Sequence, residues 1–356
     1  MSDDLRRVQT TWDALSHGDD VFNAIFGWPH RPGQTVDEFL ASGEAEIAGR
    51  LRFAERFHLP EQRRSALDFG CGAGRLTQAL ASQFGRAVGV DVAPGMIELA
   101  RSLNRQGERC EFVLNEEPAL ERFDADSFDF VYSVLVLQHL PADLQRRYAA
   151  ELARVLAPGG LLVFQAADEL VKAEPLPLEA MVAEIRPERQ RLRLAAGTQG
   201  SLRVHVRNRS EHVWPGGIGR GMVALTSGAD RAYLERDVGP GEEVVLELAV
   251  TAPREPGEYP LALDLLQEHV RRFSERYGKE RLSLRRTRPA RVVLEVVEAA
   301  GSDDAPAAPP VPEMHGLLRV DALAAVQAAG GRVLDVTEDD HAGPGWRSLT
   351  YWATKG

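Results

Sequence analysis

A glycine-rich turn constrains this 356-residue chain more than any other feature of its sequence. The turn reads Asp68-Phe69-Gly70-Cys71-Gly72-Ala73-Gly74 and lies between the apolar run 65–69 and a stretch of helical spacing at 76–84. Because glycine has no Cβ, such a turn lets the backbone approach a ligand closely, with the amides of the next helix facing it. It predicts a ligand site after the first strand of an α/β sheet, although a tight turn that binds nothing is the alternative.

The residues around this turn have the pattern of βαβ units. Short apolar runs alternate with helical stretches, and each run is apolar enough to be buried on both faces of a parallel sheet. We expect strands at 65–69, 87–90, 111–114, 128–133 and 160–164, and helices at 35–57, 76–84, 94–104 and 144–156. Thr35 and Glu38 have capping-box spacing at the start of the first helix. The pattern predicts a doubly wound, mostly parallel α/β fold.

The hydrophobic period changes to two beyond about residue 190. Leu202, Val204 and Val206 alternate with polar residues, as do the apolar residues of 244–250, and further runs follow at 261–265 and 291–297. Tyr259, after Pro256-Gly257, has the position of a tyrosine corner. We therefore expect an inserted, antiparallel, immunoglobulin-like β-sandwich over 190–298, between a first domain part at 1–170 and a linker at 299–313 rich in Ala, Pro and Asp.

The chain returns to the first domain after the linker. A helical stretch at 320–329 and apolar runs at 332–336 and 347–353 predict a last helix and two last strands over 314–356. The charge also separates the two parts, since residues 184–298 hold 20 Lys or Arg and 17 Asp or Glu, net +3, which leaves −14 for the remainder. Six arginines of the insert could form a basic face for an anionic partner, or simply a solvated strand face: Arg271, Arg272, Arg285, Arg286, Arg288 and Arg291.

Composition excludes several classes of function. The net charge of −11 disfavours attachment to nucleic acid or to an anionic membrane, both of which require a basic surface. No apolar run approaches the roughly 20 residues that cross a bilayer, and no signal-peptide pattern is present. Cys71 and Cys110 are the only cysteines, which predicts reduced thiols, and no metal-ligand cluster is visible. We expect a cytoplasmic protein without membrane insertion; its oligomeric state is not indicated.

Two polar residues follow the next strands in the order that a nucleoside cofactor requires. Asp91 ends the second strand, where a carboxylate can accept hydrogen bonds from both ribose hydroxyls; the alternative is an N-cap for the helix that begins at Pro94. Asn115 ends the third strand, where its amide could reach the adenine edge; the alternative is a turn residue. Glycine turn and acid together predict a nucleotide-type site.

The segment 66–165 resembles class I S-adenosylmethionine-dependent methyltransferases of the type 11 kind. The resemblance lies in the stretches 67–75, 88–91, 127–131, 136–139 and 154–160, and it resumes at 331–336 and 351–355. It implies a seven-stranded Rossmann-like sheet, S-adenosylmethionine as cofactor, Asp68 near the methionine amino group, and Asp91 on the ribose. Leu114-Asn115 stands where many relatives have Gly-Asp. The implied cofactor-binding residues are Asp68, Gly70, Cys71, Gly72, Gly74, Arg75, Asp91, Val92, Met96, Asn115, Glu116, Ser133, Val134 and Gln138.

Methyl transfer would require the protein to hold the acceptor near the methyl carbon and to exclude water. For a hydroxyl acceptor, His139 after the fourth strand could be the general base, or it could only cap its loop. Aromatic residues near the N-terminus could form a lid or merely anchor that segment: Trp12, Phe22, Phe26 and Trp28. We expect a small-molecule or glycan acceptor and O-methylation.

Two rival functions remain open from the sequence. A nicotinamide-dependent oxidoreductase also uses a glycine turn, but its fingerprint requires glycine where Arg75 stands. A non-catalytic binding or scaffold protein could keep the nucleotide fold without the reaction.

Overall fold

The computed structural model describes residues 2–18, 21–26, 34–170, 174–217, 222–228, 230–268, 270–275, 287–298, 312–343 and 345–356, apart from the side chains of Asn23, Ala24 and Phe26. Trp28, Arg285 and Arg286 lie outside the described residues. Internal contacts divide the chain into two compact units, Met1–Leu170 with Pro309–Gly356, and Val171–Ala308.

The first unit contains a seven-stranded sheet with the strand order β15-β16-β5-β4-β1-β2-β3. β1 to β5 pair parallel with one another, while β16 pairs antiparallel with both β5 and β15. The expected mixed α/β sheet is confirmed. The bounds are β1 Ser65–Phe69, β2 Arg86–Asp91, β3 Cys110–Leu114, β4 Phe128–Ser133, β5 Leu156–Leu170, β15 Gly331–Asp339 and β16 Trp346–Lys355.

Strand β5 is much longer than the expected 160–164. Its second half pairs with β16, from Leu161 opposite Thr354 to Leu170 opposite Trp346. The insertion in the sequence separates these partners by more than 150 residues, so the periodicity near β5 gave no sign of the pairing. The long ladder closes the sheet of the first unit across the insertion point.

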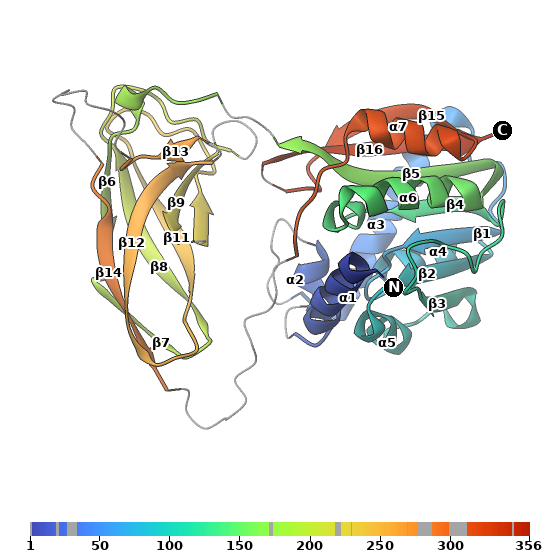
Figure 1. Ribbon diagram of the computed structural model, residues 1–356, viewed down its shortest axis with the longest axis horizontal. Helices are drawn as coiled ribbons and strands as arrows, with labels where there is room; N and C mark the ends of the chain where they lie inside the picture. The colour runs from blue at the N-terminus through green and yellow to red at the C-terminus, as the bar shows by residue number, and fades with distance from the viewer. Residues whose placement is uncertain are drawn as a thin grey trace. The chain divides into compact units, whose positions relative to one another are not determined.

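Helices cover both faces of this sheet (Figure 1). α3, α4 and α5 pack on one face with Phe130 and Trp352, and α6 and α7 pack on the other with Val131 and Phe164. The predicted capping box is confirmed, since Thr35 Oγ1 accepts from Glu38 N and Glu38 accepts from Thr35 N. The helices are α1 Asp3–Ser16, α2 Val21–Phe26, α3 Val36–Ala54, α4 Arg75–Gln83, α5 Pro94–Ser102, α6 Ala142–Val155 and α7 Arg319–Ala328, with a 3-10 turn η3 at Leu137–His139.

The second unit consists of two sheets around one hydrophobic core. One sheet has the order β10-β9-β12-β14-β7, with β13 on β12, and the other has the order β11-β8-β6. Trp214 is fully buried in this core and meets Phe273 edge to face. The strands are β6 Ala183–Pro187, β7 Arg191–Ala195, β8 Gln199–Asn208, β9 Val223–Ser227, β10 Asp230–Tyr233, β11 Glu243–Thr251, β12 Gly257–Gln267, β13 Arg271–Arg272 and β14 Ala290–Val297.

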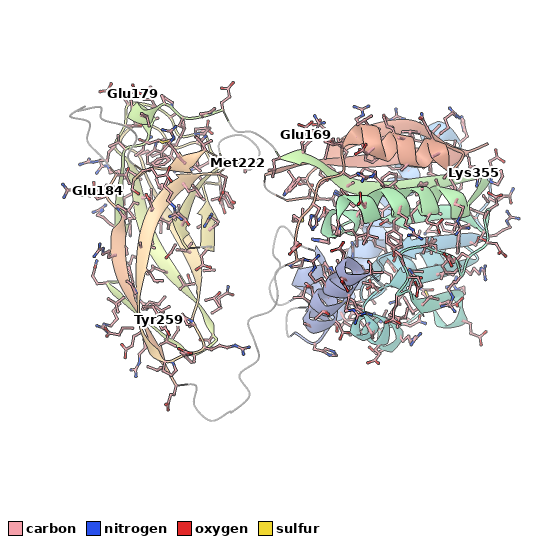
Figure 2. The ribbon with its side chains drawn as sticks, viewed as in Figure 1. Glu169, Glu179, Glu184, Met222, Tyr259 and Lys355 are labelled. Carbon is pink, nitrogen blue, oxygen red and sulfur yellow. The ribbon has the colours of Figure 1, made fainter. Side chains whose placement is uncertain are left out.

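Two details of the second unit differ from the expectation. The unit begins before residue 190, because β6 pairs with β8 at the edge of the smaller sheet; its five residues, ending in Pro187, are too short to show a period of two. The sheets are also not wholly antiparallel, since β7 pairs parallel with β14. Tyr259, near the start of β12 (Figure 2), donates a hydrogen bond from its hydroxyl to the Glu255 carbonyl at 2.8 Å, the contact expected of a tyrosine corner.

Candidate functional site

The glycine turn between β1 and α4 has a backbone that other residues adopt poorly. Gly70, Gly72 and Gly74 have φ angles of +76°, +50° and +80°. A Cβ on Gly70 would lie 2.2 Å from Cγ2 of Val136, and one on Gly74 would lie 2.8 Å from the Phe112 ring. Both conformation and space therefore require glycine here.

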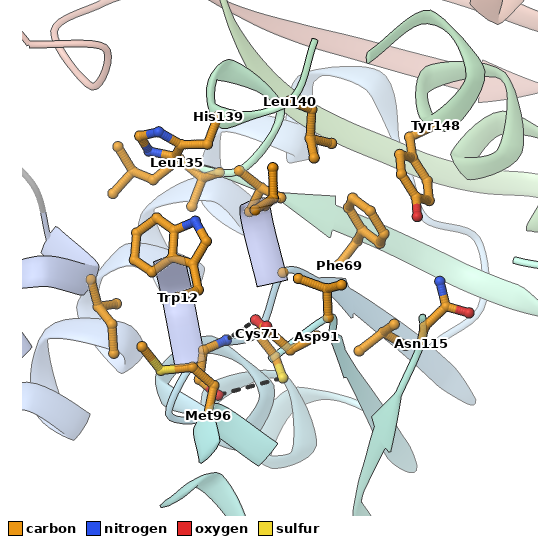
Figure 3. Close-up of a pocket in the computed structure, with 18 of the residues that line it drawn as sticks. Trp12, Phe69, Cys71, Asp91, Met96, Asn115, Leu135, His139, Leu140 and Tyr148 are labelled. Carbon is orange, nitrogen blue, oxygen red and sulfur yellow. Dashed lines mark hydrogen bonds between the residues drawn. The ribbon is translucent and has the colours of Figure 1, made fainter. Parts of the chain in front are cut away.

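A cleft with about 860 Å³ of empty space opens beside this turn. It lies at the carboxyl ends of β1, β2 and β4, where open α/β sheets bind their ligands. Figure 3 shows Trp12 and His139 next to each other on one side of the cleft and Asn115 with Tyr148 on the other. The expected site residues that line it are Gly70, Cys71, Gly72, Arg75, Asp91, Val92, Met96, Asn115, Val134 and His139.

Five expected site residues do not line this cleft: Asp68, Gly74, Glu116, Ser133 and Gln138. Asp68 is 1% exposed and accepts a hydrogen bond from Thr77 Oγ1 at 2.6 Å, behind the turn. Burial raises the pKa of Asp68 to about 7. Glu116 instead accepts from Gln9 of α1 at 2.9 Å.

Asp91 joins the glycine turn to the loop after β2. Its Oδ2 accepts from Gly72 N and its Oδ1 from Ala93 N, both at 2.9 Å. Burial raises the pKa of Asp91, and these two amides oppose that rise. The N-cap of α5 is Ala93, without a side-chain cap, so Asp91 does not serve as the cap. The Val92 amide also opposes the rise in the pKa of Asp91, so three backbone amides act on this carboxylate.

Arg75 and Asn115 are held by the protein itself. Arg75 is 3% exposed and pairs with Glu46 at 2.9 Å, which also accepts from the Tyr132 hydroxyl. Asn115 donates to the carbonyls of Glu117 and Ala119, so it does form the turn, while it also lines the cleft. Its side-chain amide therefore has protein partners already, as the turn alternative expected.

The two cysteines have thiols that are hard to ionise. Cys71 and Cys110 are both free and buried, and burial raises the pKa of the Cys71 thiol well above its usual range. Among the described residues no group of His, Cys, Asp and Glu could hold a metal ion. Within the same residues no helix is long and apolar enough to cross a membrane.

Helix α1 covers the cleft with an apolar face that we did not single out from the sequence. Leu5, Val8 and Trp12 line the cleft, at the spacing i, i+3, i+7 that could have shown this face. α1 docks on the loop after β2, where Asp13 Oδ1 accepts from Gly95 N at 2.7 Å and Gln9 donates to the Val92 carbonyl at 3.0 Å. Trp12 thus lies where a lid was expected.

The prediction that Phe22 could be part of an aromatic lid is wrong. Its ring stacks on Phe39 of α3 at 4.2 Å and does not line the cleft, because the apolar side of α2 packs against α3 there. Ile25 of α2 lines the cleft instead. Trp28 and the side chain of Phe26 lie outside the described residues.

His139 stands in the wall of the cleft at the end of η3. Its Nδ1 lies 3.0 Å from the carbonyl oxygen of Glu313, and its ring meets Trp12 edge to face at 5.2 Å. Burial lowers the pKa of His139 to about 4. The imidazole is therefore neutral near pH 7.

Comparison with known proteins finds a similarity over the same part of the chain. The family model described as "Methyltransferase domain" matches residues 67–164. A curated relative, 2-methyl-6-phytyl-1,4-hydroquinone methyltransferase of Synechocystis sp., is 35% identical over 28% of this chain and 30% of its own length. Ubiquinone biosynthesis O-methyltransferase of Coxiella burnetii is 28% identical over 35% of this chain and 52% of its own length.

The matches thus span about a third to a half of these relatives. Among solved structures, the chain is similar to magnesium protoporphyrin IX methyltransferase of Synechocystis PCC 6803, at 12% identity and a TM-score of 0.46 over 99% of this chain and 100% of that one. The match to this family model supports an enzyme with S-adenosylmethionine as its cofactor.

Proposed function

We propose that the protein transfers a methyl group from S-adenosylmethionine to a hydroxyl of a small molecule or glycan. The observation that carries this proposal is the cleft itself, in which a glycine turn and a buried acid meet at the carboxyl ends of β1 and β2. When bound, S-adenosylmethionine supplies a methyl group activated by its positively charged sulfur. Every other part of the work falls to residues of the chain.

The residues of the cleft fit this cofactor in size and chemistry. Helix α4 begins directly after the turn and has no side-chain cap, so the amides of its first turn are suited to a carboxylate. Asp91 lines the cleft at the end of β2, where its carboxylate would accept hydrogen bonds from the ribose hydroxyls. Val92, Met96 and Asn115 line the part of the cleft that would take the adenine. Asp68, behind the turn, adds negative potential for the cationic methionine end.

The class of acceptor is proposed from His139, in the wall of the cleft beside Trp12. His139 is neutral at pH 7 and stands in the cleft wall, so it can receive the proton of a hydroxyl. The two curated relatives above are named for hydroquinone methylation and for an O-methyltransferase of ubiquinone biosynthesis. Both names favour a small-molecule acceptor. Sugar hydroxyls stay within the proposal because the same base would serve them.

The second unit is proposed to be an inserted immunoglobulin-like sandwich with a binding role. Its support is the single core between two sheets and the hydroxyl contact of Tyr259. Asn208 and Ser210 bond one another and nearby backbone, so they shape a turn. The two free cysteines agree with the cytoplasmic location that we also propose.

A labelled-methyl assay tests the proposed reaction. The protein, incubated with S-adenosylmethionine carrying a labelled methyl group and a small-molecule extract, is expected to label a compound that loses the label under ether-cleaving conditions. His139→Ala should lower the rate about 100-fold, the usual contribution of a general base, without weakening cofactor binding. Labelling that resists ether cleavage would exclude O-methylation, and an unchanged rate in His139→Ala would exclude the base.

A further inference from the structure

The segment 312–317, which we call the return segment, leads from the second unit back into α7 and lies against η3. His315 N donates to the Gln138 carbonyl and Leu317 N to the Ala167 carbonyl, both at 2.7 Å. Gln145 donates to the carbonyl of His315 at 3.2 Å. The return segment is therefore a fixed part of the first unit, with its backbone beside His139.

A second cavity, with about 490 Å³ of empty space, adjoins the cofactor cleft. Val8, Trp12 and His139 line both spaces, and Pro312, Glu313 and His315 of the return segment line only the second. His139 thus stands in the wall that the two spaces share. An acceptor that enters the second cavity would meet this imidazole before it reaches the cofactor.

The hydrogen bond to Glu313 decides where the imidazole carries its proton. A carbonyl oxygen accepts hydrogen bonds and cannot donate them, so Nδ1 at 3.0 Å must be the protonated nitrogen. A neutral imidazole has one such proton. The lone pair is therefore on Nε2.

A chain of amides on the other side of the ring leads to the same assignment. It starts at the backbone N–H of Leu135, which donates to Gln165 Oε1 at 3.0 Å. Gln165 Nε2 must then be the atom that donates to Gln138 Oε1 at 2.9 Å. This leaves Gln138 Nε2, a donor, 3.4 Å from His139 Nε2, which can only accept. Because both ends of the network are backbone groups, the direction of every bond is determined.

We propose that Gln138, Gln165 and the carbonyl of Glu313 are positioning residues that hold His139 in its Nδ1–H tautomer, with Nε2 ready to take the proton of a hydroxylated acceptor in the second cavity. The inference rests on the proposed function. As the acceptor oxygen bonds to the methyl carbon, the sulfur–methyl bond breaks and the sulfur keeps its electron pair. The hydroxyl proton passes to Nε2, which leaves an imidazolium still bonded to Glu313. The long contact to Gln138 is the one that the incoming hydroxyl replaces.

The amide network is anchored through Gln165 at residues that line neither the cofactor cleft nor the second cavity. Gln165 is 1% exposed and also donates to Ser348 Oγ at 2.9 Å, which in turn donates to Asp339. The Gln165 amide, on β5, is thus held by Ser348 of β16 and Asp339 of β15. Gln138, which the resemblance assigned to the cofactor, acts in this account on the imidazole.

Nitrogen NMR of the full chain labelled at histidine tests the tautomer directly, without a known acceptor. The His139 signals, assigned by their loss in His139→Asn, are expected to show a protonated Nδ1 and an unprotonated Nε2 at pH 7. Gln138→Glu places a carboxylate where the amide donated, so Nε2 should become protonated and the pKa of His139 should rise by about one unit or more. The other charged or titratable groups around the second cavity are Asp4, Arg7, Glu313 and His315.

Two control variants separate this effect from packing and from charge. Gln138→Met keeps the length of the side chain but removes the donor, so the Nδ1–H tautomer should lose population while the pKa of His139 does not rise as in Gln138→Glu. Gln327→Glu adds the same charge on the exposed side of α7 and should change neither the tautomer nor the pKa. Protonated Nε2 in the unmodified protein, or equal shifts in Gln138→Met and Gln138→Glu, would overturn the proposal. Calorimetry with S-adenosylmethionine on the same samples reports the proposed function separately.

Discussion

Burial acts in opposite directions on the acid and the base nearest the glycine turn. It raises the pKa of Asp68 to about 7 and lowers the pKa of His139 to about 4, so both groups tend toward neutrality. Neither shift requires an ion-pair partner, because burial is the largest cause of each. Asp68 is consequently a group whose charge destabilises the fold, kept at a place where a cationic ligand would benefit from it.

Asp68→Asn tests this cost through its pH dependence. The folded pKa of Asp68 lies above its unfolded value of 3.8, so its favourable contribution is complete below pH 3.8 and is lost as the pH rises through about 7. Asparagine keeps the bond from Thr77 without the charge. At pH 8.5 the variant should therefore melt at a higher temperature than the unmodified protein, with a free energy of unfolding greater by at most about 4 kcal/mol. This difference in stability should become smaller toward pH 4.

The matched control for this substitution is Asp143→Asn at the exposed start of α6. Thermal melts of all three proteins across that pH range give the comparison. A gap for Asp68→Asn that is the same at both ends of the range would contradict the raised pKa.

Gly70→Ala should damage the turn through contact as well as conformation. Its Cβ would meet Val136 at 2.2 Å, whereas Gly107, at φ +60°, has no atom within 4 Å of the same position. Gly107→Ala therefore measures the cost of positive φ alone, about 1 kcal/mol. We expect Gly70→Ala to lose clearly more stability in denaturant melts, and adding Val136→Ala to restore part of it. Equal losses for the two single variants would show that the contact with Val136 is unimportant.

Helix α1 is the element that turns an open sheet edge into an enclosed site. Its contacts with the loop after β2 are two side-chain-to-backbone bonds, from Asp13 and Gln9, and an apolar face. The Asp13 bond satisfies the Gly95 amide in the first turn of α5, which has no cap of its own. The N-terminal end of α5 is thus capped by a side chain of α1, and the same bond holds α1 beside the loop after β2.

Asp13→Ala should loosen α1 at a cost of about 1 kcal/mol, the usual value of a lost cap. Amides of α1 should then exchange faster with solvent, and S-adenosylhomocysteine, the demethylated product, should dissociate about fivefold faster. Asp3→Ala, on the exposed first turn of the same helix, is the control. Unchanged release from Asp13→Ala would mean that α1 does not control access.

The elements that could be predicted were those with strong local patterns. β1, β4 and the capping box of α3 matched because an apolar run, or a pair at fixed spacing, is visible within a few residues. The extension of β5, the strand β6 and the parallel pairing of β7 with β14 were missed, since each is decided by a partner far along the chain. The contact of Leu5 and Val8 with the cleft and the position of Glu313 beside His139 were missed for the same reason, since their partners lie far along the chain.

The second unit interrupts the first unit in the sequence, but the sheet of the first unit is continuous. β5, which precedes the second unit, and β16, which follows it, pair with one another over eight residue pairs. Leu317 of the return segment also bonds Ala167 of β5. Among the described residues, those that form the sheet and line the cleft belong to the first unit.

Removal of residues 174–308, with a short Gly-Ser connection, should consequently leave a first unit that folds and binds S-adenosylmethionine. Circular dichroism melts and calorimetry on the shortened and full chains give the comparison. Cofactor affinity within about threefold of the full chain is expected. A shortened chain that folds but no longer binds would show that the second unit contributes to the cofactor site.

Calorimetric titration of the full chain with S-adenosylmethionine and with S-adenosylhomocysteine tests the central claim most directly. One equivalent of each should bind, and Asp91→Ala should weaken both by tenfold or more, while Asp143→Ala leaves them unchanged. The absence of heat and of any thermal shift with either compound in the unmodified protein would contradict the claim that this cleft holds the methyl donor.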